Sequence, residues 1–336
     1  MTAALVLQTS FLGDVVLTTP LLTHLAARGA VDVVATPAGA AILDGHPAVR
    51  RVIAYDKRRA DAGPRALARL AGTLRDARYD AAYHAQGSSR TAALSWLARI
   101  PVRRGFDASA GRWLYTERVR YRKAEHHARR LLDLAAPADA PLPRPTLHPA
   151  GADHDAAAAL LASAPFGDAA FVALAPGSVW GTKRWPDYPA LVAALPPELG
   201  IVVVGGAEDA PQAAAIAATA SERVLDATGR LRILATAALL ARATALVTND
   251  SLPQHLASAM DVPTITVFGP TVPQFGFGPL ATTARVVEHP GPLACRPCSS
   301  HGPATCPLGH WRCMREIPPA TVAAALASVT RDVAPR

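Results

Sequence analysis

The segment Leu246-Val-Thr-Asn-Asp-Ser-Leu-Pro-Gln-His255 decides the fold of this chain. An apolar run stops at Asn249, Asp250 and Ser251, and a helical pattern begins there. We expect a buried strand that leads into a helix N-terminus, where free N–H groups and the helix dipole attract anions. His255 lies one turn further along, on the same side as Ser251. The segment predicts a phosphate site; the alternative is a simple helix cap.

A second segment, residues 171–186, has the same character. An apolar run from Phe171 leads into Pro-Gly-Ser-Val-Trp-Gly-Thr-Lys-Arg-Trp-Pro186, a loop of small and cationic residues with proline at an expected helix start. Ser178 and Thr182 offer hydroxyl donors, while Lys183 and the neighbouring Arg184 offer positive charge. Such a loop can hold a diphosphate, and the alternative is an ordinary solvated turn.

The N-terminus repeats the strand-to-helix pattern. The apolar run Ala4–Leu7 precedes Gln8-Thr-Ser-Phe-Leu-Gly-Asp14. Asp14 is therefore expected in the first turn of a helix at the carboxyl end of a strand, where open α/β sheets place ligands. The glycine spacings of dinucleotide-binding and P-loop proteins are absent, so neither class gains support. The alternative role for Asp14 is to stabilise the helix dipole.

Strand and helix patterns alternate along the whole chain, which predicts an α/β fold with parallel sheets. We expect strands at 31–36, 51–55, 79–85, 171–175, 201–205, 245–247 and 264–268, and helices at 64–78, 88–100, 231–243 and 319–329. Five prolines between residues 136 and 151 make a stiff connection. We therefore predict one domain over 1–150, a second over 151–317, and a C-terminal helical segment, 318–336, packed back on the body.

Composition narrows the class of protein. The chain has 336 residues, half of them apolar, which is enough for two sizeable cores. The net charge of +8 suits an acidic partner, but no nucleic-acid-binding motif occurs, so nucleic acid is not expected. No run of about 18 apolar residues could span a bilayer. With no visible secretion signal, we expect a cytoplasmic location.

The three segments, in this order, resemble the lipopolysaccharide heptosyltransferase family, with its S-x-L-G-D-x-x-x-T-x-P, A-P-G-S-x-W-x-T-K-R-W-P and N-D-S-G-P-x-H-L-A motifs. The resemblance runs from residue 5 to about residue 325. It includes the tail Cys306–Met314, which is similar to the ending of some heptosyltransferase II sequences. Leu252 stands where the family usually has glycine, which leaves its effect on the donor pocket open. The resemblance implies the GT-B fold, two Rossmann-like domains with parallel sheets facing across a cleft.

The resemblance also implies a mechanism. The C-terminal domain would bind ADP-heptose, and the N-terminal domain would bind Kdo2-lipid A or heptosyl-Kdo2-lipid A. Asp14 would act as general base in an inverting displacement, with Lys183 and fixed donors neutralising the departing ADP. The donor site would comprise Ser178, Thr182, Lys183, Asp226, Thr228, Asp250, Ser251, Leu252 and His255. For Asp226 and Thr228 the alternative is a turn before an amphipathic helix.

Cations of the N-terminal half are candidates for the acceptor. Kdo carboxylates and lipid A phosphates suit arginine, and we select Arg58, Arg90, Arg104 and Arg122; the alternative for each is a solvated face. A basic surface would also contact the anionic cytoplasmic face of the inner membrane. We expect a monomer.

Metal ligands give two contrasting signals. The only Asp-x-Asp pair, Asp153-His-Asp155, precedes an alanine-rich helix and resembles a cap, so no divalent ion or other cofactor is expected in catalysis. All four cysteines, Cys295, Cys298, Cys306 and Cys313, lie close together with two histidines. A structural thiolate metal site is one interpretation, and free thiols are the other.

Two other functions stay open at this point. One is a nucleotide-sugar epimerase or another hexosyltransferase of GT-B fold. The other is a non-catalytic, metal-stabilised binding module. Within the heptosyltransferase family, the cysteine-rich tail favours heptosyltransferase II over heptosyltransferase I.

Overall fold

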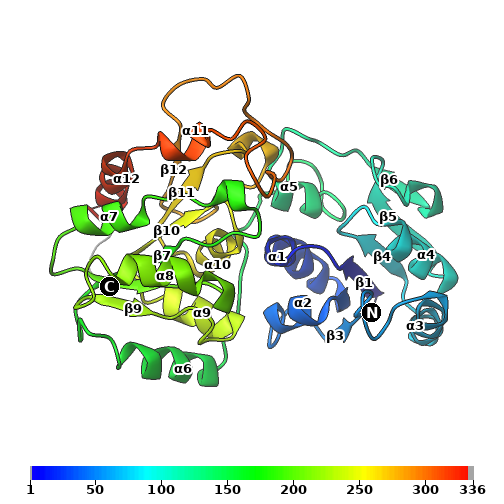
Figure 1. The fold of residues 1–336 in the computed structure, drawn as a ribbon. Coiled ribbons are helices and arrows are strands. Elements are labelled where there is room, and N and C mark those ends of the chain that lie inside the picture. The colour runs from blue at the N-terminus through cyan, green and yellow to red at the C-terminus, as the bar shows by residue number, and fades with distance from the viewer. Residues whose placement is uncertain (1, 332–336) are drawn as a thin grey trace. The chain divides into compact units, whose positions relative to one another are not determined.

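The computed structural model describes residues 2–331 and divides the chain into two compact units, Met1–His148 and Pro149–Arg336 (Figure 1). Each unit contains one sheet of six parallel strands, with helices connecting successive strands. The predicted α/β class with parallel sheets is confirmed. None of the described helices is long and apolar enough to cross a membrane.

In the first unit the strand order reverses beside the first strand. The sheet order is β3-β2-β1-β4-β5-β6, so the chain runs outward from β1 to β3 and then returns to place β4 on the other side of β1. Its elements are β1 (Thr2–Gln8), α1 (Leu12–Ala26), β2 (Gly29–Ala35), α2 (Pro37–Ile42), β3 (Arg51–Ala54), α3 (Pro64–Asp76), β4 (Ala81–His84), α4 (Ser89–Leu97), β5 (Val102–Phe106), η1 (Arg112–Leu114), β6 (Glu117–Val119) and α5 (His127–Leu132).

The second unit repeats this arrangement. Its sheet order is β12-β11-β10-β7-β8-β9, so the reversal falls between β7 and β10. Its elements are α6 (Gly151–Leu161), β7 (Phe171–Ala175), η2 (Gly181–Lys183), α7 (Tyr188–Ala194), β8 (Gly200–Val203), η3 (Ala207–Asp209), α8 (Ala210–Ala217), β9 (Val224–Asp226), α9 (Ile233–Leu240), β10 (Ala245–Asn249), α10 (Leu252–Met260), β11 (Thr264–Phe268), η4 (Pro273–Phe275), β12 (Ala284–Glu288), α11 (Arg312–Arg315) and α12 (Pro319–Arg331). Loops that follow the two strands at such a reversal diverge, which is where open α/β sheets bind ligands.

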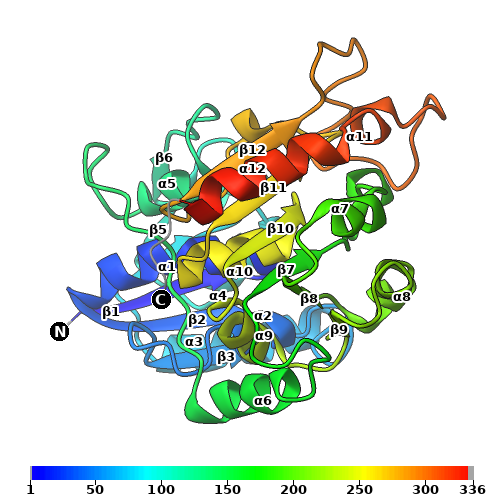
Figure 2. The same ribbon diagram turned by 90° about the vertical axis from the view of Figure 1, so that its left-hand side faces the viewer.

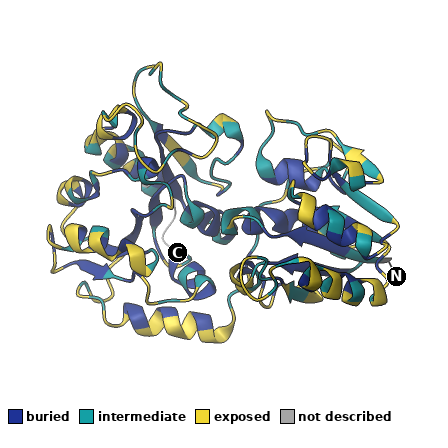
Figure 3. Cartoon of the chain, turned by 45° about the vertical axis from the view of Figure 1, so that its right-hand side comes forward, coloured by how far each residue is buried: buried dark blue, intermediate teal, exposed yellow. Residues whose placement is uncertain are grey.

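The central strands are buried along their whole length. Every residue of β7, β10 and β11 is buried, as expected for parallel strands with helices on both faces. Figure 3 shows buried strands inside each unit and exposed residues on the outer sides of the helices. Helix α12 packs along β10, β11 and β12 (Figure 2) and adds Val322, Leu326 and Val329 to the core. Residues 332–336 of the predicted C-terminal segment lie outside the described residues.

Four strands were not predicted from the sequence. These are β5, β6, β9 and β12, which are short and carry charged residues such as Arg103, Arg104 and Glu117. Strands β6 and β12 lie at sheet edges, where one side of the strand is not paired, so no continuous apolar run marks them. The helices predicted at 88–100 and 231–243 are shorter in the structure, at Ser89–Leu97 and Ile233–Leu240.

A buried carboxylate connects β2 with the start of β3 and with the segment before β4. Asp32 on β2 is fully buried and accepts hydrogen bonds from Arg50 (2.8 and 2.9 Å), from Arg51 (2.9 Å) and from the Tyr79 hydroxyl (2.5 Å). Burial alone raises the pKa of this carboxyl, but the hydrogen bonds from Arg50, Tyr79 and Arg51 outweigh burial and lower it. Asp32 is therefore ionised at neutral pH and stabilises the folded state.

We predict that Asp32→Asn lowers the free energy of unfolding by about 2 kcal/mol at neutral pH, since both arginine partners are half exposed. A lowered folded-state pKa stabilises above the unfolded pKa of about 3.9, and this contribution is lost as the pH falls through the folded pKa. Urea unfolding followed by circular dichroism should show the difference between wild type and variant shrinking in acid. Asp76→Asn, at an exposed position on α3, is the control. A difference that is independent of pH would contradict the prediction.

Candidate active site

Asn249, the last residue of β10, connects the two loops at the strand reversal of the second unit. Its Nδ2 donates to the carbonyl of Pro176 (2.7 Å), and its Oδ1 accepts from the backbone N–H of Trp185 (3.2 Å) and the hydroxyl of Tyr188 (3.3 Å). All of these atoms are buried. One amide side chain therefore fixes the 176–185 loop against the start of α10.

Lys183 and Asp250 form an ion pair at the same place. The Lys183 ammonium donates to Asp250 Oδ2 at 2.6 Å, and the Thr271 hydroxyl donates to the same oxygen at 2.7 Å. Both members of the pair are buried. An ammonium has three N–H donors, so Asp250 holds Lys183 in position while the ammonium keeps donors for an anion.

Helix α10 begins beside this pair. Ser251 is its N-cap residue and has extended backbone angles, but its side chain does not cap the helix. Its Oγ lies 3.4 Å from the carbonyl oxygen of Asn249. Leu252 is the first helical residue, and His255 is buried one turn further along. Since Asp250 is bound to Lys183 and Ser251 does not cap, the simple-cap alternative loses its support.

The Thr182 side chain is bound within the protein. Its hydroxyl donates to the carbonyl of Pro303 (2.5 Å), which lies in the segment that contains the four cysteines. A Cβ at Gly181 would lie 2.3 Å from the carbonyl oxygen of Ala304, so only glycine fits there. Ser178 Oγ accepts from the Trp180 N–H at 3.2 Å. This part of the loop is held by contacts within the protein.

Asp226 ends β9 and Thr228 follows it, and β9 is separated from β10 by the two strands β7 and β8. The N–H and the hydroxyl of Thr228 both donate to Asp226 Oδ1, at 2.8 and 2.7 Å. This is a local turn stabilised by a carboxylate. The structure does not bring these two residues into contact with Lys183 or Ser251.

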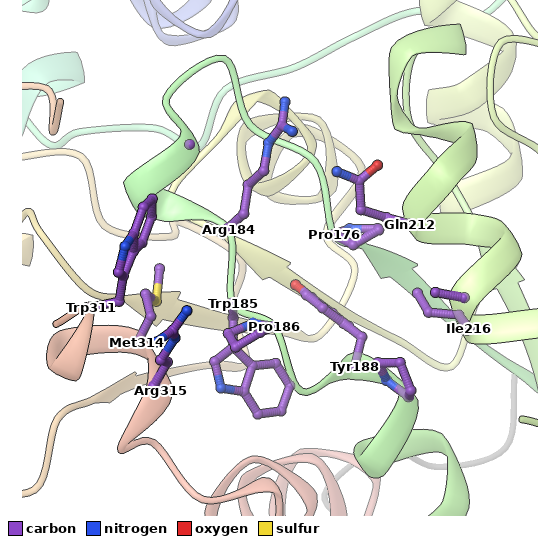
Figure 4. A pocket seen from close by; sticks show the side chains of 13 residues that line it. Pro176, Arg184, Trp185, Pro186, Tyr188, Gln212, Ile216, Trp311, Met314 and Arg315 are labelled. Carbon is purple, nitrogen blue, oxygen red and sulfur yellow. The ribbon is translucent and has the colours of Figure 1, made fainter. Parts of the chain in front are cut away.

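A pocket of about 300 Å³ lies beside the 176–185 loop (Figure 4). Pro176, Arg184, Trp185, Trp311 and Arg315 are among its lining residues. Lys183, Asp250, Ser251 and His255 do not line it. The candidate active site is therefore defined by the strand reversal and its polar contacts, and this pocket is a separate feature.

Asp14 occupies the corresponding place in the first unit, in the first turn of α1 at the end of β1. The Ser10 hydroxyl donates to Asp14 Oδ2 at 2.6 Å, and His127 Nε2 lies 3.7 Å from Oδ1. Burial, with contributions from Arg130 and His126, lowers the pKa of His127 to about 3. The imidazole is therefore neutral at pH 7, and its contact with Asp14 is not an ion pair.

Sequence reasoning missed the contribution of α5 to this place. Helices α1 and α5 pack together, which brings His127 and Arg130 near Asp14. Burial lowers the pKa of Arg130, while Tyr121 and Asp14 act in the opposite direction. More than a hundred residues separate α5 from Asp14 in the sequence, so no local pattern indicates this contact.

A second polar cluster surrounds Thr9 at the end of β1. The Lys57 ammonium donates to the Thr9 carbonyl (2.8 Å) and hydroxyl (3.1 Å), and Gln86 Nε2 donates to the same hydroxyl (2.6 Å). Arg90 lies 3.4 Å from the Lys57 carbonyl oxygen and from the Tyr55 hydroxyl. Burial, Arg58 and Arg90 lower the pKa of Lys57. These cations gather at the ends of β1, β3 and β4.

The four arginines selected for the acceptor divide into two pairs. Arg90 belongs to the Thr9 cluster, and Arg58 is exposed next to Lys57. Arg104 is bound to Glu117 (2.7 Å), and Arg122 is bound to Asp133 (2.6 Å). The structure therefore groups Arg58 and Arg90 near the strand ends, while Arg104 and Arg122 are engaged in ion pairs of their own.

The residues that were considered as metal ligands have ordinary structural contacts. Asp153 accepts from the backbone N–H of Ala150 (2.9 Å) at the start of α6 and pairs with Arg232, consistent with a capping role. Cys295 Sγ lies 3.8 Å from His310 Nε2, and burial, with the other three cysteines, raises the pKa of Cys313 to about 11. Within residues 2–331, no group of three or more His, Cys, Asp or Glu side chains is arranged to hold a metal ion.

Known proteins are similar to this chain in sequence and in fold. The pattern of glycosyltransferase family 9 (heptosyltransferase) matches residues 67–310. Lipopolysaccharide heptosyltransferase 1 of Pseudomonas aeruginosa is 33% identical over 317 residues, which cover 88% of this chain and 85% of that protein.

Two solved structures give the architecture. The structure of E. coli ADP-heptose lipopolysaccharide heptosyltransferase II covers 99% of both chains, with a TM-score of 0.80 at 24% identity. E. coli heptosyltransferase WaaC with ADP-2-deoxy-2-fluoro heptose covers 86% of this chain and 94% of its own, with a TM-score of 0.65 at 26% identity. The two Rossmann-like sheets and these neighbours confirm the predicted GT-B fold class. The chain belongs to glycosyltransferase family 9, the heptosyltransferases.

Proposed function

We propose that this heptosyltransferase transfers L-glycero-D-manno-heptose from ADP-heptose to the inner core of lipopolysaccharide, and that its acceptor is heptosyl-Kdo2-lipid A, as for heptosyltransferase II. The observation that carries the proposal is the buried Lys183–Asp250 pair, held at the strand reversal beside the N-terminus of α10. A relative of the same family was solved with an ADP-heptose analogue. Family membership favours glycosyl transfer over the epimerase and the binding module.

The donor site would work by fixed positive charge. The Lys183 ammonium and the backbone N–H groups at the start of α10 would bind the diphosphate and neutralise the charge that ADP gains as it leaves. Asp250 would keep Lys183 in place, and Ser251 and His255 would add donors. Ser178 and Thr182 would shape the loop, and Leu252 would narrow the pocket near the sugar. Asp226 and Thr228 would bind the nucleoside.

The acceptor chemistry would belong to the first unit. Asp14 would remove the proton from an acceptor hydroxyl as its oxygen bonds to the anomeric carbon, and the bond from that carbon to the ADP oxygen would break with inversion. Ser10 would orient the Asp14 carboxylate. Lys57 and Arg90, with the exposed Arg58, would bind the anionic groups of the acceptor. Arg104 and Arg122 would contribute only after release from their acidic partners.

The proposed catalysis relies on positive charge supplied by the protein itself. Lys183 and the helix N-terminus supply the positive charge that a divalent ion would otherwise provide, so catalysis would need no metal or other cofactor. The protein would act as a monomer on the cytoplasmic face of the inner membrane, bound peripherally. Heptosyltransferase I activity is a second candidate, because a relative with that name is 33% identical to this chain.

We expect ADP, but not UDP or GDP, to raise the thermal midpoint of the protein in excess EDTA, because a ligand of the folded state stabilises it. At a hundredfold excess over Kd the gain is about 2.7 kcal/mol. Under the same conditions, transfer from ADP-heptose should be faster to heptosyl-Kdo2-lipid A than to Kdo2-lipid A. A preference for Kdo2-lipid A would assign heptosyltransferase I activity. A midpoint that only UDP raises would reject the proposed donor.

Asp14→Asn should lower kcat by about 10²- to 10⁴-fold, because the amide cannot accept the proton. The rise in thermal midpoint with ADP should not change, since the donor site belongs to the other unit. Asp76→Asn, at an exposed position in the same unit, should retain full activity.

Ser10→Ala tests the same base by pH. Loss of a hydrogen bond to the charged carboxylate should raise the pKa of Asp14, so kcat/KM should begin to fall at a higher pH as the solution is acidified. Full activity of Asp14→Asn would show that Asp14 is not the general base. A pH profile of kcat/KM for Ser10→Ala that is identical to that of the wild type would lead to the same conclusion.

Lys183→Met should lower the free energy of unfolding by about 3 kcal/mol, because it leaves the Asp250 carboxylate buried without its ammonium partner. Adding Asp250→Asn should restore much of this loss, while the rise in thermal midpoint with ADP should stay absent in the double variant. The double variant thus separates folding from binding. Lys123→Met, at an exposed position, is the control. Normal ADP binding by the double variant would show that Lys183 is only structural.

A further inference from the structure

Two tryptophans of the first unit are exposed on adjoining elements. The Trp113 side chain, in η1, is 70% exposed, and Trp96, in α4, is 53% exposed. Helix α4 contacts η1, and Gly111 packs against Ala92 of that helix so closely that a Cβ would lie 2.4 Å from the Ala92 methyl. Trp96 is one turn beyond Ala92 and therefore lies on the same side of α4. The two indoles belong to one surface.

Buried contacts anchor the segment that contains Trp113. Tyr115, two residues later, is buried: its ring stacks on His84 with centroids 4.5 Å apart and lies where a Cβ of Gly105 would be. The guanidinium of Arg103 donates to the carbonyl of Leu114 at 2.8 Å. The loop is thus anchored on both sides of the exposed indole, so its exposure does not come from a loose segment.

Arginines pack on Trp113, and another arginine follows Trp96 closely in the chain. The guanidinium carbons of Arg112 and Arg118 lie 4.7 and 5.3 Å from the centre of the Trp113 ring, within cation–π range. Arg99 is exposed directly after α4, and its N–H donates to the Trp96 carbonyl. The surface therefore combines aromatic rings and positive charge.

The charge around this surface is almost all of one sign. Residues 86–123 contain nine arginines or lysines and two acidic residues, a net charge of +7 out of the +8 of the chain. Both acids have partners in the fold: Asp107 accepts from the Tyr121 N–H, and Glu117 binds Arg104. A partner of opposite charge is therefore required to complement the surface.

We propose that the surface formed by Trp96, Arg99, Arg112, Trp113 and Arg118 binds the anionic phospholipid headgroup layer of a bilayer, with the Trp113 ring inserted at its interface. Indoles favour the boundary between headgroups and acyl chains, and arginines bind lipid phosphates. This inference extends the peripheral membrane contact proposed above by assigning it to a surface of the first unit. Vesicle binding needs neither donor nor turnover, so its outcome is independent of heptosyl transfer.

The test is sedimentation of the full chain with vesicles of phosphatidylglycerol mixed with phosphatidylcholine, compared with phosphatidylcholine alone. We expect binding only to the anionic vesicles, a loss of about tenfold in partitioning for Trp113→Ala, and a smaller loss for Trp113→Phe. The wild-type tryptophan emission should shift to the blue on binding, and Trp113→Phe should reduce that shift. Arg112→Gln with Arg118→Gln should weaken the preference for anionic lipid.

Matched controls are available on the second unit. Leu308→Ala and Val179→Ala each remove an apolar side chain that is more than half exposed and should leave vesicle binding unchanged. All variants should keep the wild-type thermal midpoint. Equal binding by Trp113→Ala and wild type, or no preference for anionic vesicles, would overturn the proposal. Two other results would also overturn it, if Trp113→Ala still binds vesicles normally. Loss of a dimer seen for the wild type would make the surface a contact between copies of the chain, and loss of affinity for lipid-free core oligosaccharide would make it an acceptor site.

Discussion

The reversal of strand order in each parallel sheet is the constraint on which the rest of this structure depends. All six strands of a sheet point the same way, so their carboxyl ends share one edge, and the loops diverge only beside β1 and β7. The candidate catalytic residues follow the strands at these reversals. They are Asp14 in one unit and Lys183 with Asp250 in the other. Position in the topology, more than any single motif, makes them candidates for catalysis.

The sequence was sufficient to predict the class of fold and the segments that follow β1, β7 and β10, because fully buried strands are continuous apolar runs. It was insufficient for β6 and β12, whose edge positions leave no such run. The partners of the polar residues could not be predicted either. The Thr182 hydroxyl binds the Pro303 carbonyl, and a contact across more than a hundred residues leaves no trace in local spacing.

Buried polar groups in both units are fixed by several partners before any ligand binds. Asn249 has contacts on both sides of its amide, and Asp250 accepts from Lys183 and Thr271 through one oxygen. The free energy that orders these side chains comes from folding, so a ligand that reaches the site does not have to supply it. Preorganisation of this kind suits a reaction in which charge appears on a leaving diphosphate.

The bond between Thr182 and Pro303 has a consequence for synthesis of the chain. The loop that follows β7 is translated long before Pro303 and Ala304, yet it is held by them. Domains fold largely as units while the ribosome moves along the message. The first unit can therefore be complete while the loop that contains Lys183 still lacks its support. The second unit gains its final geometry only after Pro303 and Ala304 have been made.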